Sequence, residues 1–270
     1  MDYTGAGALR CLAARLEEGV LAIAFAQERF DVALSLEMER LLRAVASDAE
    51  VRVVLLRGGA DGFSAGLDAE DFADASRHGE ATLRTARAAD AAWRTRLLRV
   101  LPQPVIAVVH GVCAGEACTV LESCDIVLAA DDARFSLLQE ETGDFASGTV
   151  AKAAARVIAQ RAARYHALTG RSFDGREAER NGLATRSVPA ASLDAEAQAL
   201  AAELAAKDAL ALQFTKETLL HVPDMSWDGV LSYTAAKFAE LKALQAGRPS
   251  ARAAAVESFL AGKSKPGLGS

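Results

Sequence analysis

The chain has 270 residues, of which 51% are hydrophobic, and its formal net charge is −6 at neutral pH. This length and apolar content argue against a disordered chain and allow one large domain, or one domain with a small appendage. The mildly acidic balance gives no reason to expect nucleic acid as a partner. No apolar run reaches the roughly 18 residues that a membrane span requires, so we expect no membrane partner.

The first half of the sequence alternates short apolar runs with segments of helical periodicity. We expect strands at 20–25, 51–56, 105–109 and 126–130, with a candidate further strand at 133–137. Helices are expected between them, at 34–47, 83–101 and 117–124. This alternation predicts an α/β fold in which parallel strands are joined by right-handed helical crossovers. The Arg-rich run between Arg84 and Arg99 is interpreted as a solvated helix face.

The second half is Ala-rich and helical from Thr149 onward. Two long helices are expected at 199–221 and 227–246, separated by Pro223, and a short helix follows up to Leu260. We therefore divide the chain into a core domain, residues 1–198, and a C-terminal helical region, residues 199–270.

The four cysteines, Cys11, Cys113, Cys118 and Cys124, have spacings unlike those of a zinc site, and we expect no bound metal. Their apolar neighbours predict buried, reduced thiols in a cytoplasmic protein, with a reactive Cys118 as the alternative. The first residues are too charged and too poorly organised for a signal peptide, which agrees with a cytoplasmic location.

Two segments combine an apolar strand with a Gly-containing turn: the first includes its strand, and the second follows the strand at 51–56. One is PVIAVVHGVCAGEACTVLESCD at 104–125, and the other is GFSAGLD at 62–68. Two strand ends that each open such a turn can direct two backbone N–H groups at one point. A pair of this kind is an oxyanion hole, which stabilises negative charge developing on a carbonyl oxygen. The two segments therefore indicate a reaction class before any catalytic side chain is identified.

Together these segments resemble the crotonase superfamily, also called the enoyl-CoA hydratase/isomerase family, and the resemblance covers nearly the whole chain. It is strongest at VRVVLLRGGADGFSAGLDAEDF (51–72), at 104–137 and at TGRSFDGREAERNGLATRSVP (169–189). Within the family the chain is most similar to the feruloyl-CoA hydratase/lyase branch. That similarity lies in Trp93, the 143–152 loop, the segment that begins at Trp227 and the ending FLAGKSKPGL.

The resemblance implies a fold of repeated ββα units with C-terminal helices that form a homotrimer or a dimer of trimers. It also implies an acyl thioester substrate, carried by coenzyme A or by the phosphopantetheine of a carrier protein, with no other cofactor. Carried over by position, the two amides that hold the thioester oxygen while an enolate forms belong to Leu67 and Glu116. These donors are main-chain groups, so the assignment does not depend on the side chains.

The sequence departs from this family at its acid–base positions. Thr119 and Gln139 stand where the hydratases have two glutamates. A hydroxyl cannot act as a base near neutral pH, and an amide cannot exchange a proton in this role. Glu140 or Asp144 could supply the missing carboxylate, or both could be solvated loop residues. Glu116 replaces a glycine, and we expect its side chain to point away from the hole because its charge would repel an enolate.

Substrate contacts are predicted from the same resemblance. Ala65 and Asp68 belong to the first motif, beside Leu67. Phe72 stands where the hydratase/lyase branch has a phenol-binding tyrosine, whereas Tyr233 is retained. Arg29 could replace a lost basic pair that meets the phosphates of coenzyme A, and the loss leaves a carrier-protein thioester open.

These departures favour a lyase-type reaction, decarboxylation or C–C cleavage, because the loss of carbon dioxide makes an enolate without a strong base. One alternative is an enoyl-CoA hydratase or hydratase/lyase that uses Glu140 or Asp144. Another is a catalytically silent subunit for thioester binding or assembly. His78, in the variable segment after the first motif, is either an acid or base at the site or an exposed histidine.

Overall fold

The computed structural model describes residues 9–138, 145–246, 257 and 259–262, and divides the chain into two compact units. The first unit comprises residues 1–206 and holds both β-sheets, and the second comprises residues 207–270. Predicted catalytic residues Gln139, Glu140 and Asp144 lie outside the described residues. Among the described residues, no helix combines the length and the apolar character needed to cross a membrane.

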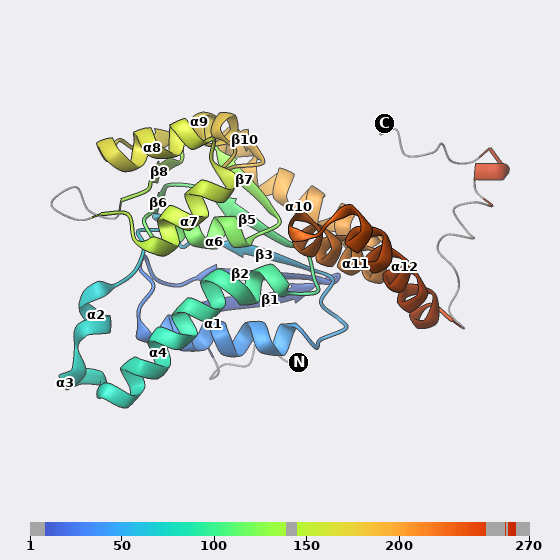
Figure 1. Cartoon of the computed structure of the whole chain (residues 1–270). Helices are drawn as coiled ribbons and strands as arrows, with labels where there is room; N and C mark the ends of the chain where they lie inside the picture. The colour runs from blue at the N-terminus through green and yellow to red at the C-terminus, as the bar shows by residue number, and fades with distance from the viewer. Residues whose placement is uncertain (1–8, 139–144, 247–256, 258, 263–270) are drawn as a thin grey trace. The chain divides into compact units, whose positions relative to one another are not determined.

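The larger sheet has six strands in the order β1-β2-β3-β5-β7-β10. These are β1 (Leu12–Glu17), β2 (Val20–Phe25), β3 (Val53–Arg57), β5 (Val105–Val109), β7 (Ile126–Ala130) and β10 (Arg186–Val188). The β1–β2 pair is antiparallel, and the other neighbours are parallel. Every residue of β5 is buried, as expected for a parallel strand that is covered on both faces (Figure 1). The predicted α/β class is therefore confirmed.

A smaller sheet has four strands in the order β4-β6-β8-β9. They are β4 (Gly62–Ser64), β6 (Val112–Ala114), β8 (Arg134–Ser136) and β9 (Phe173–Asp174). Strands β4, β6 and β8 are parallel to one another, and each follows a strand of the larger sheet directly: β3, β5 and β7. The chain therefore repeats a strand–strand–helix unit, which agrees with the ββα fold implied by the family resemblance.

Two glycines permit the close approach of β4 and β6. Gly111 adopts φ +56, and a Cβ there would lie 2.4 Å from the carbonyl oxygen of Asp61. A Cβ on Gly62 would likewise lie 2.4 Å from the backbone nitrogen of Val112. Only glycine accommodates both the positive φ and this contact, so these two positions set the spacing of the two strands that lead into the candidate site.

Helices cover the larger sheet. Helix α1 (Val32–Val45) runs beside α4 (Glu80–Ala92), and α10 (Ala190–Ala206) packs against β2, β3, β5 and β7. The remaining helices of this unit are α2 (Ala69–Ala73), α3 (Ala75–His78), α5 (Leu98–Val100), α6 (Ala117–Ser123), α7 (Gly148–Val157), α8 (Gln160–Thr169) and α9 (Gly175–Asn181). The core beneath α1 and α4 is aromatic, since Phe25, Phe30, Phe63 and Trp93 meet there at ring centroid distances of 5.1–6.2 Å.

Two predicted helices differ from the structure. The helix predicted at 83–101 begins at Glu80 and is interrupted by a π-helical turn, η1 (Trp93–Leu97). The helix predicted at 199–221 is two helices, α10 and α11 (Ala209–His221). The second break has a local cause: the Asp208 side chain accepts a hydrogen bond from the Ala211 N–H at 2.8 Å and caps a new helix.

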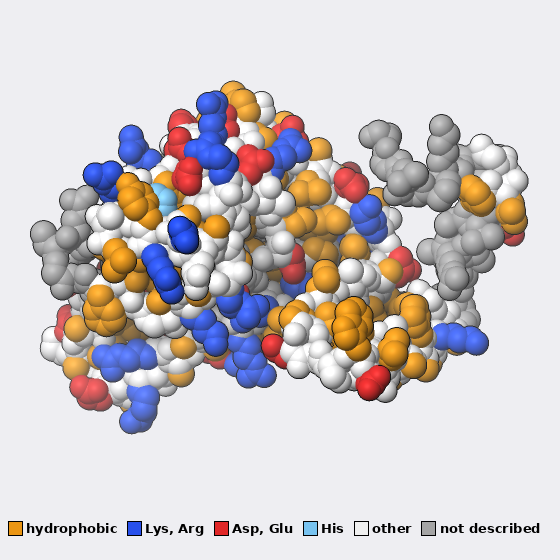
Figure 2. All heavy atoms as spheres, turned by 45° about the horizontal axis from the view of Figure 1, so that its top comes forward, with side chains coloured by type: hydrophobic (Ala, Val, Ile, Leu, Met, Phe, Trp, Pro, Cys, Tyr) orange, Lys and Arg blue, Asp and Glu red, His pale blue; other side chains and the backbone are white. Residues whose placement is uncertain are grey.

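The second unit contains α11, a short 3₁₀ turn η2 (Val222–Asp224) and α12 (Trp227–Leu244). Lys237 ties the two helices together through Glu217 at 2.8 Å, and its ammonium lies 5.0 Å from the centre of the Phe214 ring. The hydrogen bond with Glu217 raises the pKa of Lys237 above its usual value. Hydrophobic side chains gather on this helix pair in Figure 2, and Trp227 and Phe238 are among the exposed ones.

Candidate active site

The two predicted oxyanion donors follow neighbouring strands of the smaller sheet. Strands β4 and β6 pair in parallel, with Gly62 opposite Val112, and the chain reaches Leu67 and Glu116 within three residues of the two strand ends. The carboxyl ends of parallel strands meet at one edge of a sheet, which is where α/β proteins usually bind ligands. The structure therefore places both peptide groups after adjacent strand ends.

Main-chain hydrogen bonds hold the segment around Leu67. Leu67 forms a parallel bridge with Phe30, in which the Phe30 N–H donates to the Gly66 carbonyl at 2.8 Å and the Asp68 N–H donates to the Phe30 carbonyl at 2.9 Å. In a parallel bridge the central residue directs its own N–H and C=O away from the partner strand. The Ser64 hydroxyl accepts a bond from the Gly66 N–H at 3.1 Å and tightens the same turn.

The segment around Glu116 begins the helix α6. The Gly115 N–H donates to the Ser136 carbonyl at 3.0 Å, which ties the turn to β8. Glu116 is the N-cap of α6 and already has helical φ and ψ angles of −63° and −16°. Among the described residues, the Glu116 N–H has no hydrogen-bond acceptor. An N–H at a helix start lacks a partner within the helix, so this donor can bind a ligand.

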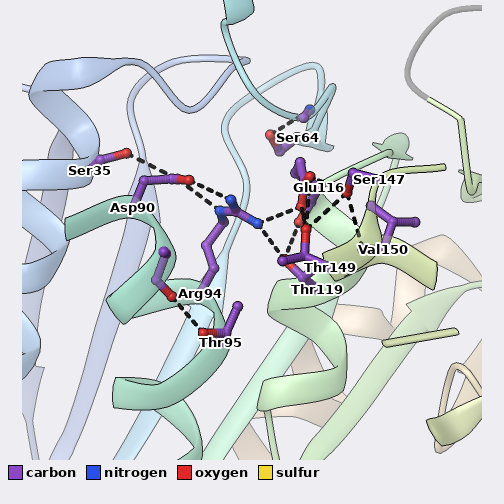
Figure 3. Close-up of polar contacts among 12 residues, drawn as sticks. Ser35, Ser64, Asp90, Arg94, Thr95, Glu116, Thr119, Ser147, Thr149 and Val150 are labelled. Carbon is purple, nitrogen blue, oxygen red and sulfur yellow. Dashed lines mark hydrogen bonds and ion pairs between the residues drawn. The ribbon is translucent and has the colours of Figure 1, made fainter. Parts of the chain in front are cut away.

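The Glu116 carboxylate is held by three side chains (Figure 3). Arg94 Nη1 donates to its Oε2 at 2.6 Å, and the Ser147 hydroxyl donates to its Oε1 at 2.5 Å. The Thr149 hydroxyl lies 3.0 and 2.8 Å from the two carboxylate oxygens. The side chain is only 13% exposed. These contacts hold the Glu116 side chain in one orientation. Whether this orientation is away from a bound thioester oxygen, as expected from the sequence, stays a prediction.

Arg94 is buried in the π-helical turn, with 5% of its side chain exposed. Its Nε donates to Asp90 Oδ1 at 2.8 Å and its Nη2 to Asp90 Oδ2, while Nη1 also donates to the Thr119 hydroxyl at 2.8 Å. Asp90 is buried as well and accepts a bond from the Ser35 hydroxyl at 3.3 Å. Burial lowers the pKa of Arg94. The hydrogen bond from Arg94 to Asp90 and the charge of Asp90 together outweigh this effect, so the pKa is raised overall.

The interpretation of the Arg84–Arg99 run as a solvated face is therefore wrong for Arg94. Arg84, at the other end of the run, is exposed, in agreement with that interpretation. The sequence signal that could have identified Arg94 is an acidic residue, Asp90, one helical turn earlier and a tryptophan, Trp93, next to it. Those features indicate burial of this part of the helix, but they do not identify its distant partners Glu116 and Thr119.

Thr119 is almost fully buried, and its hydroxyl has two fixed partners. It donates to the Glu116 carbonyl at 2.7 Å and accepts from Arg94 at 2.8 Å. A hydroxyl has one proton to donate, and here the Glu116 carbonyl accepts it. The arrangement agrees with the expectation that Thr119 is not a base.

The predicted substrate contacts are distributed over both units. Ala65 and Phe72 are buried, and Asp68 caps α2 by accepting a bond from the Asp71 N–H at 2.9 Å. Arg29 is half-buried in the loop before α1. Tyr233 lies on α12 of the second unit and is half-buried there. Their contact with a substrate stays a prediction.

His78 is paired rather than exposed. Its Nε2 lies 2.7 Å from Asp71 Oδ1, and 17% of its side chain is accessible. Asp71 is buried and also accepts bonds from the Val32 N–H at 3.0 Å and from Arg77 at 2.9 Å. Burial raises the pKa of Asp71, but the bonds from His78 and Val32 outweigh it, so the pKa is lowered overall. This cluster links α1, α2 and α3.

The cysteines are buried apart from Cys124, which is half-buried, and all four are free thiols. Burial is the largest cause that raises the pKa of Cys11, to about 11, and it also raises the pKa of Cys113. Thiols of this kind are poor nucleophiles. The described part of the chain contains no group of three His, Cys, Asp or Glu side chains placed to hold a metal ion.

Comparison with known proteins gives a consistent result. The family model of enoyl-CoA hydratase/isomerase matches residues 15–246. Hydroxycinnamoyl-CoA hydratase-lyase of Pseudomonas fluorescens is 30% identical over 237 residues, which cover 87% of this chain and 85% of that protein. A probable enoyl-CoA hydratase of Mycobacterium tuberculosis is 33% identical over 64% of this chain and 65% of its own length.

A solved structure of a putative enoyl-CoA hydratase from Streptomyces coelicolor is 26% identical, covers 98% of both chains and superposes with a TM-score of 0.82. The folds agree over nearly the full length, and the family match spans both the larger sheet and the two strand ends described above. The chain belongs to the enoyl-CoA hydratase/isomerase family.

Proposed function

We propose that this protein is an enzyme that converts an acyl thioester, of coenzyme A or of a carrier protein, through an enolate whose oxygen accepts hydrogen bonds from the Leu67 and Glu116 N–H groups. The observation that supports this most is the parallel pairing of β4 and β6, which brings the two segments to one edge of the smaller sheet. Two such donors stabilise the charge that develops on the thioester oxygen.

We further propose that the reaction is of the lyase type, either decarboxylation or C–C bond cleavage. The Thr119 hydroxyl is engaged by the Glu116 carbonyl and by Arg94, and Gln139 cannot accept a proton from carbon. Loss of carbon dioxide from a 2-carboxyacyl thioester leaves its electron pair on the α carbon and the thioester oxygen. A proton from solvent then gives the acyl thioester, so the step needs no strong base.

The hydratase and hydratase/lyase reactions are the main alternative, and a relative named as a hydroxycinnamoyl-CoA hydratase-lyase favours them. They would require Glu140 or Asp144 as the acid or base. Phe72 argues against a hydroxycinnamoyl substrate, because its ring is buried against Val32 and Leu83 and carries no hydroxyl to bind a phenol. From the family we also propose a homotrimer or a dimer of trimers located in the cytoplasm.

The test is a substrate panel analysed by mass spectrometry. The purified protein is incubated with coenzyme A and pantetheine thioesters of 2-carboxyacyl, 3-oxoacyl and 2-enoyl chains. We expect loss of carbon dioxide or chain cleavage. Addition of water to the 2-enoyl thioesters alone would support the hydratase alternative, particularly if Glu140→Gln or Asp144→Asn abolished it.

Two further outcomes would also be decisive. Binding of thioesters without turnover would indicate the catalytically silent subunit. The absence of both binding and turnover across the panel would overturn the assignment of an acyl thioester substrate. Light scattering of the same sample gives the oligomeric state.

A further inference from the structure

A carboxylate at an oxyanion-hole position creates an electrostatic problem. Glu116 contributes its N–H to the proposed hole, and its own side chain carries a negative charge on the same residue. An enolate oxygen bound at that N–H would be repelled by an uncompensated carboxylate a few ångströms away, and the repulsion is larger in a buried site than in water. The site therefore requires either a neutral residue at this position or a cation that compensates the charge.

Arg94 supplies such a cation, and Asp90 shares its single positive charge with Glu116. Its guanidinium contacts Glu116 Oε2 at 2.6 Å through Nη1, and it is the only cation bonded to Glu116 or Asp90 in the described part of the chain. A buried charge is stable only where partners satisfy it, and Arg94 has two carboxylates and the Thr119 hydroxyl. The group is thus fixed in place before any substrate binds.

The same guanidinium also acts on the Glu116 main chain. Arg94 Nη1 donates to the Thr119 hydroxyl at 2.8 Å, and that hydroxyl donates to the Glu116 carbonyl at 2.7 Å. One arginine nitrogen therefore contacts Glu116 twice, directly at the carboxylate and through Thr119 at the peptide. Ser147 and Thr149 at the start of α7 hold the other side of the carboxylate. These contacts restrain the Glu116 side chain and the peptide that follows it, next to the peptide that carries the Glu116 N–H.

The backbone around Arg94 is unusual in the same place. It lies in the π-helical turn η1 between α4 and α5, and the preceding residue, Trp93, is fully buried in the aromatic core. π-Helical turns are rare and occur frequently at functional sites. Here the turn places two successive bulky side chains in buried positions, with Trp93 in the core and Arg94 against α6 (Figure 3).

We propose that Arg94 is a positioning residue of the active site. It offsets part of the charge of the Glu116 carboxylate and holds that carboxylate in one orientation, while the Thr119 hydroxyl holds the peptide that follows. This inference rests on the proposed function, since it assumes that the Glu116 N–H binds an enolate oxygen. It makes one specific claim: Arg94 is needed because residue 116 is a glutamate, and it becomes dispensable when that residue is a glycine.

The experiment uses acetoacetyl-coenzyme A as a probe, because its enolate absorbs in the near ultraviolet and its keto form does not. The absorbance of the enzyme-bound probe reports how strongly the site stabilises the enolate, independently of the natural reaction. All variants carry Asp90→Asn, so that the removal of Arg94 does not leave Asp90 as a second unpaired buried carboxylate. Melting temperatures are measured for each variant.

We expect Arg94→Met in the D90N protein to lower the enolate-to-keto ratio of the bound probe by about 10- to 100-fold. Binding of the keto form should change by less than about threefold, since its acetoacetyl group is neutral and carries no charge at the site for Arg94 to act on. In D90N with Glu116→Gly, the same Arg94→Met change should alter the ratio by less than about twofold. Arg94→Lys, which keeps the charge, should restore part of the ratio.

The outcomes separate the two proposals. The D90N protein that retains both Arg94 and Glu116 tests the proposed function. If it does not bind the probe, or binds it without enolate formation, the proposed function is wrong. If the enolate forms, the proposed role of Arg94 is tested next. An Arg94→Met change that lowers the enolate-to-keto ratio equally in the parent and E116G proteins, or in neither, would show that this role is wrong. Should Arg94→Met not fold, the neutral polar variant Arg94→Gln, compared in the E116G and parent proteins, provides the same test.

Discussion

The two segments that supply the proposed oxyanion donors are built from different interactions. The Leu67 segment is held by main-chain hydrogen bonds to Phe30, whereas the Glu116 segment depends on the buried side chains of Arg94 and Thr119. Main-chain bonds survive most substitutions, but a charged network loses its balance when one member is removed. One half of the site therefore tolerates sequence change, whereas the other half requires several residues to change together.

Removal of the Arg94 guanidinium should have the largest effect on stability, and it acts on the Glu116 half of the site. Arg94→Met leaves two buried carboxylates without their cation and should lower the free energy of unfolding by about 3–5 kcal/mol. Arg84→Met provides a matched control, because Arg84 lies on α4, which leads into η1, and its side chain is exposed. It should change stability by less than about 0.5 kcal/mol. Urea unfolding measures both, and equal effects would contradict the proposed difference.

Removing the donor at residue 116 should have the next largest effect. Glu116→Pro suits the observed φ of −63° but eliminates the N–H. It should lower kcat on the substrate found in the panel by about 10²–10³-fold. Glu116→Ala also loses the carboxylate but keeps the N–H, so it is the matched control. If the two variants were equally active, the N–H of residue 116 would have no role in catalysis.

Acid titration examines the Leu67 half, where Asp71 joins α1, α2 and α3. The folded-state pKa of Asp71 is lowered, so the unfolded chain binds more protons and stability decreases as pH falls below about 4. Above that pH the stabilisation is fully present. Asp71→Asn should reduce this pH dependence by about 1 kcal/mol across the window. Urea unfolding between pH 3 and 6 measures it, and an unchanged slope would contradict the assignment.

Truncating the Leu67 side chain should have the smallest effect on catalysis. Leu67→Ala retains the peptide N–H and should change kcat by less than about threefold. A cost in stability is expected, because Leu67 packs partly buried against both hydrophobic clusters of the first unit. Loss of kcat as severe as that of E116P, in a protein that remains folded, would show that this half also depends on its side chain.

Much of the fold could be predicted from apolar periodicity. The strands at 20–25, 105–109 and 126–130 have the expected bounds, because each is a short, continuous apolar run. The strand β1 was not predicted from LAARLE, whose charged residues conceal an edge strand that alternates between buried and exposed positions. The π-helical turn has no signal in hydrophobic spacing.

The candidate site was less predictable than the fold. Leu67 and Glu116 could be located because they follow recognisable strand ends and act through the main chain. Arg94 could not be assigned to the site, since an arginine among other arginines on a helix indicates solvent exposure and its partners Glu116 and Thr119 are distant in the sequence. Contacts between residues far apart in the sequence have no periodicity, so only the folded structure identifies them.

The Arg94–Glu116 contact has an evolutionary consequence. A glutamate at 116 without the arginine places an unpaired charge in the site, whereas an arginine at 94 without the glutamate still pairs with Asp90. Only the first replacement is an unfavourable intermediate, so the arginine should have arisen before the glutamate. Family members that share this construction should carry both, 22 positions apart, and members with a small residue at 116 should be free to vary at 94.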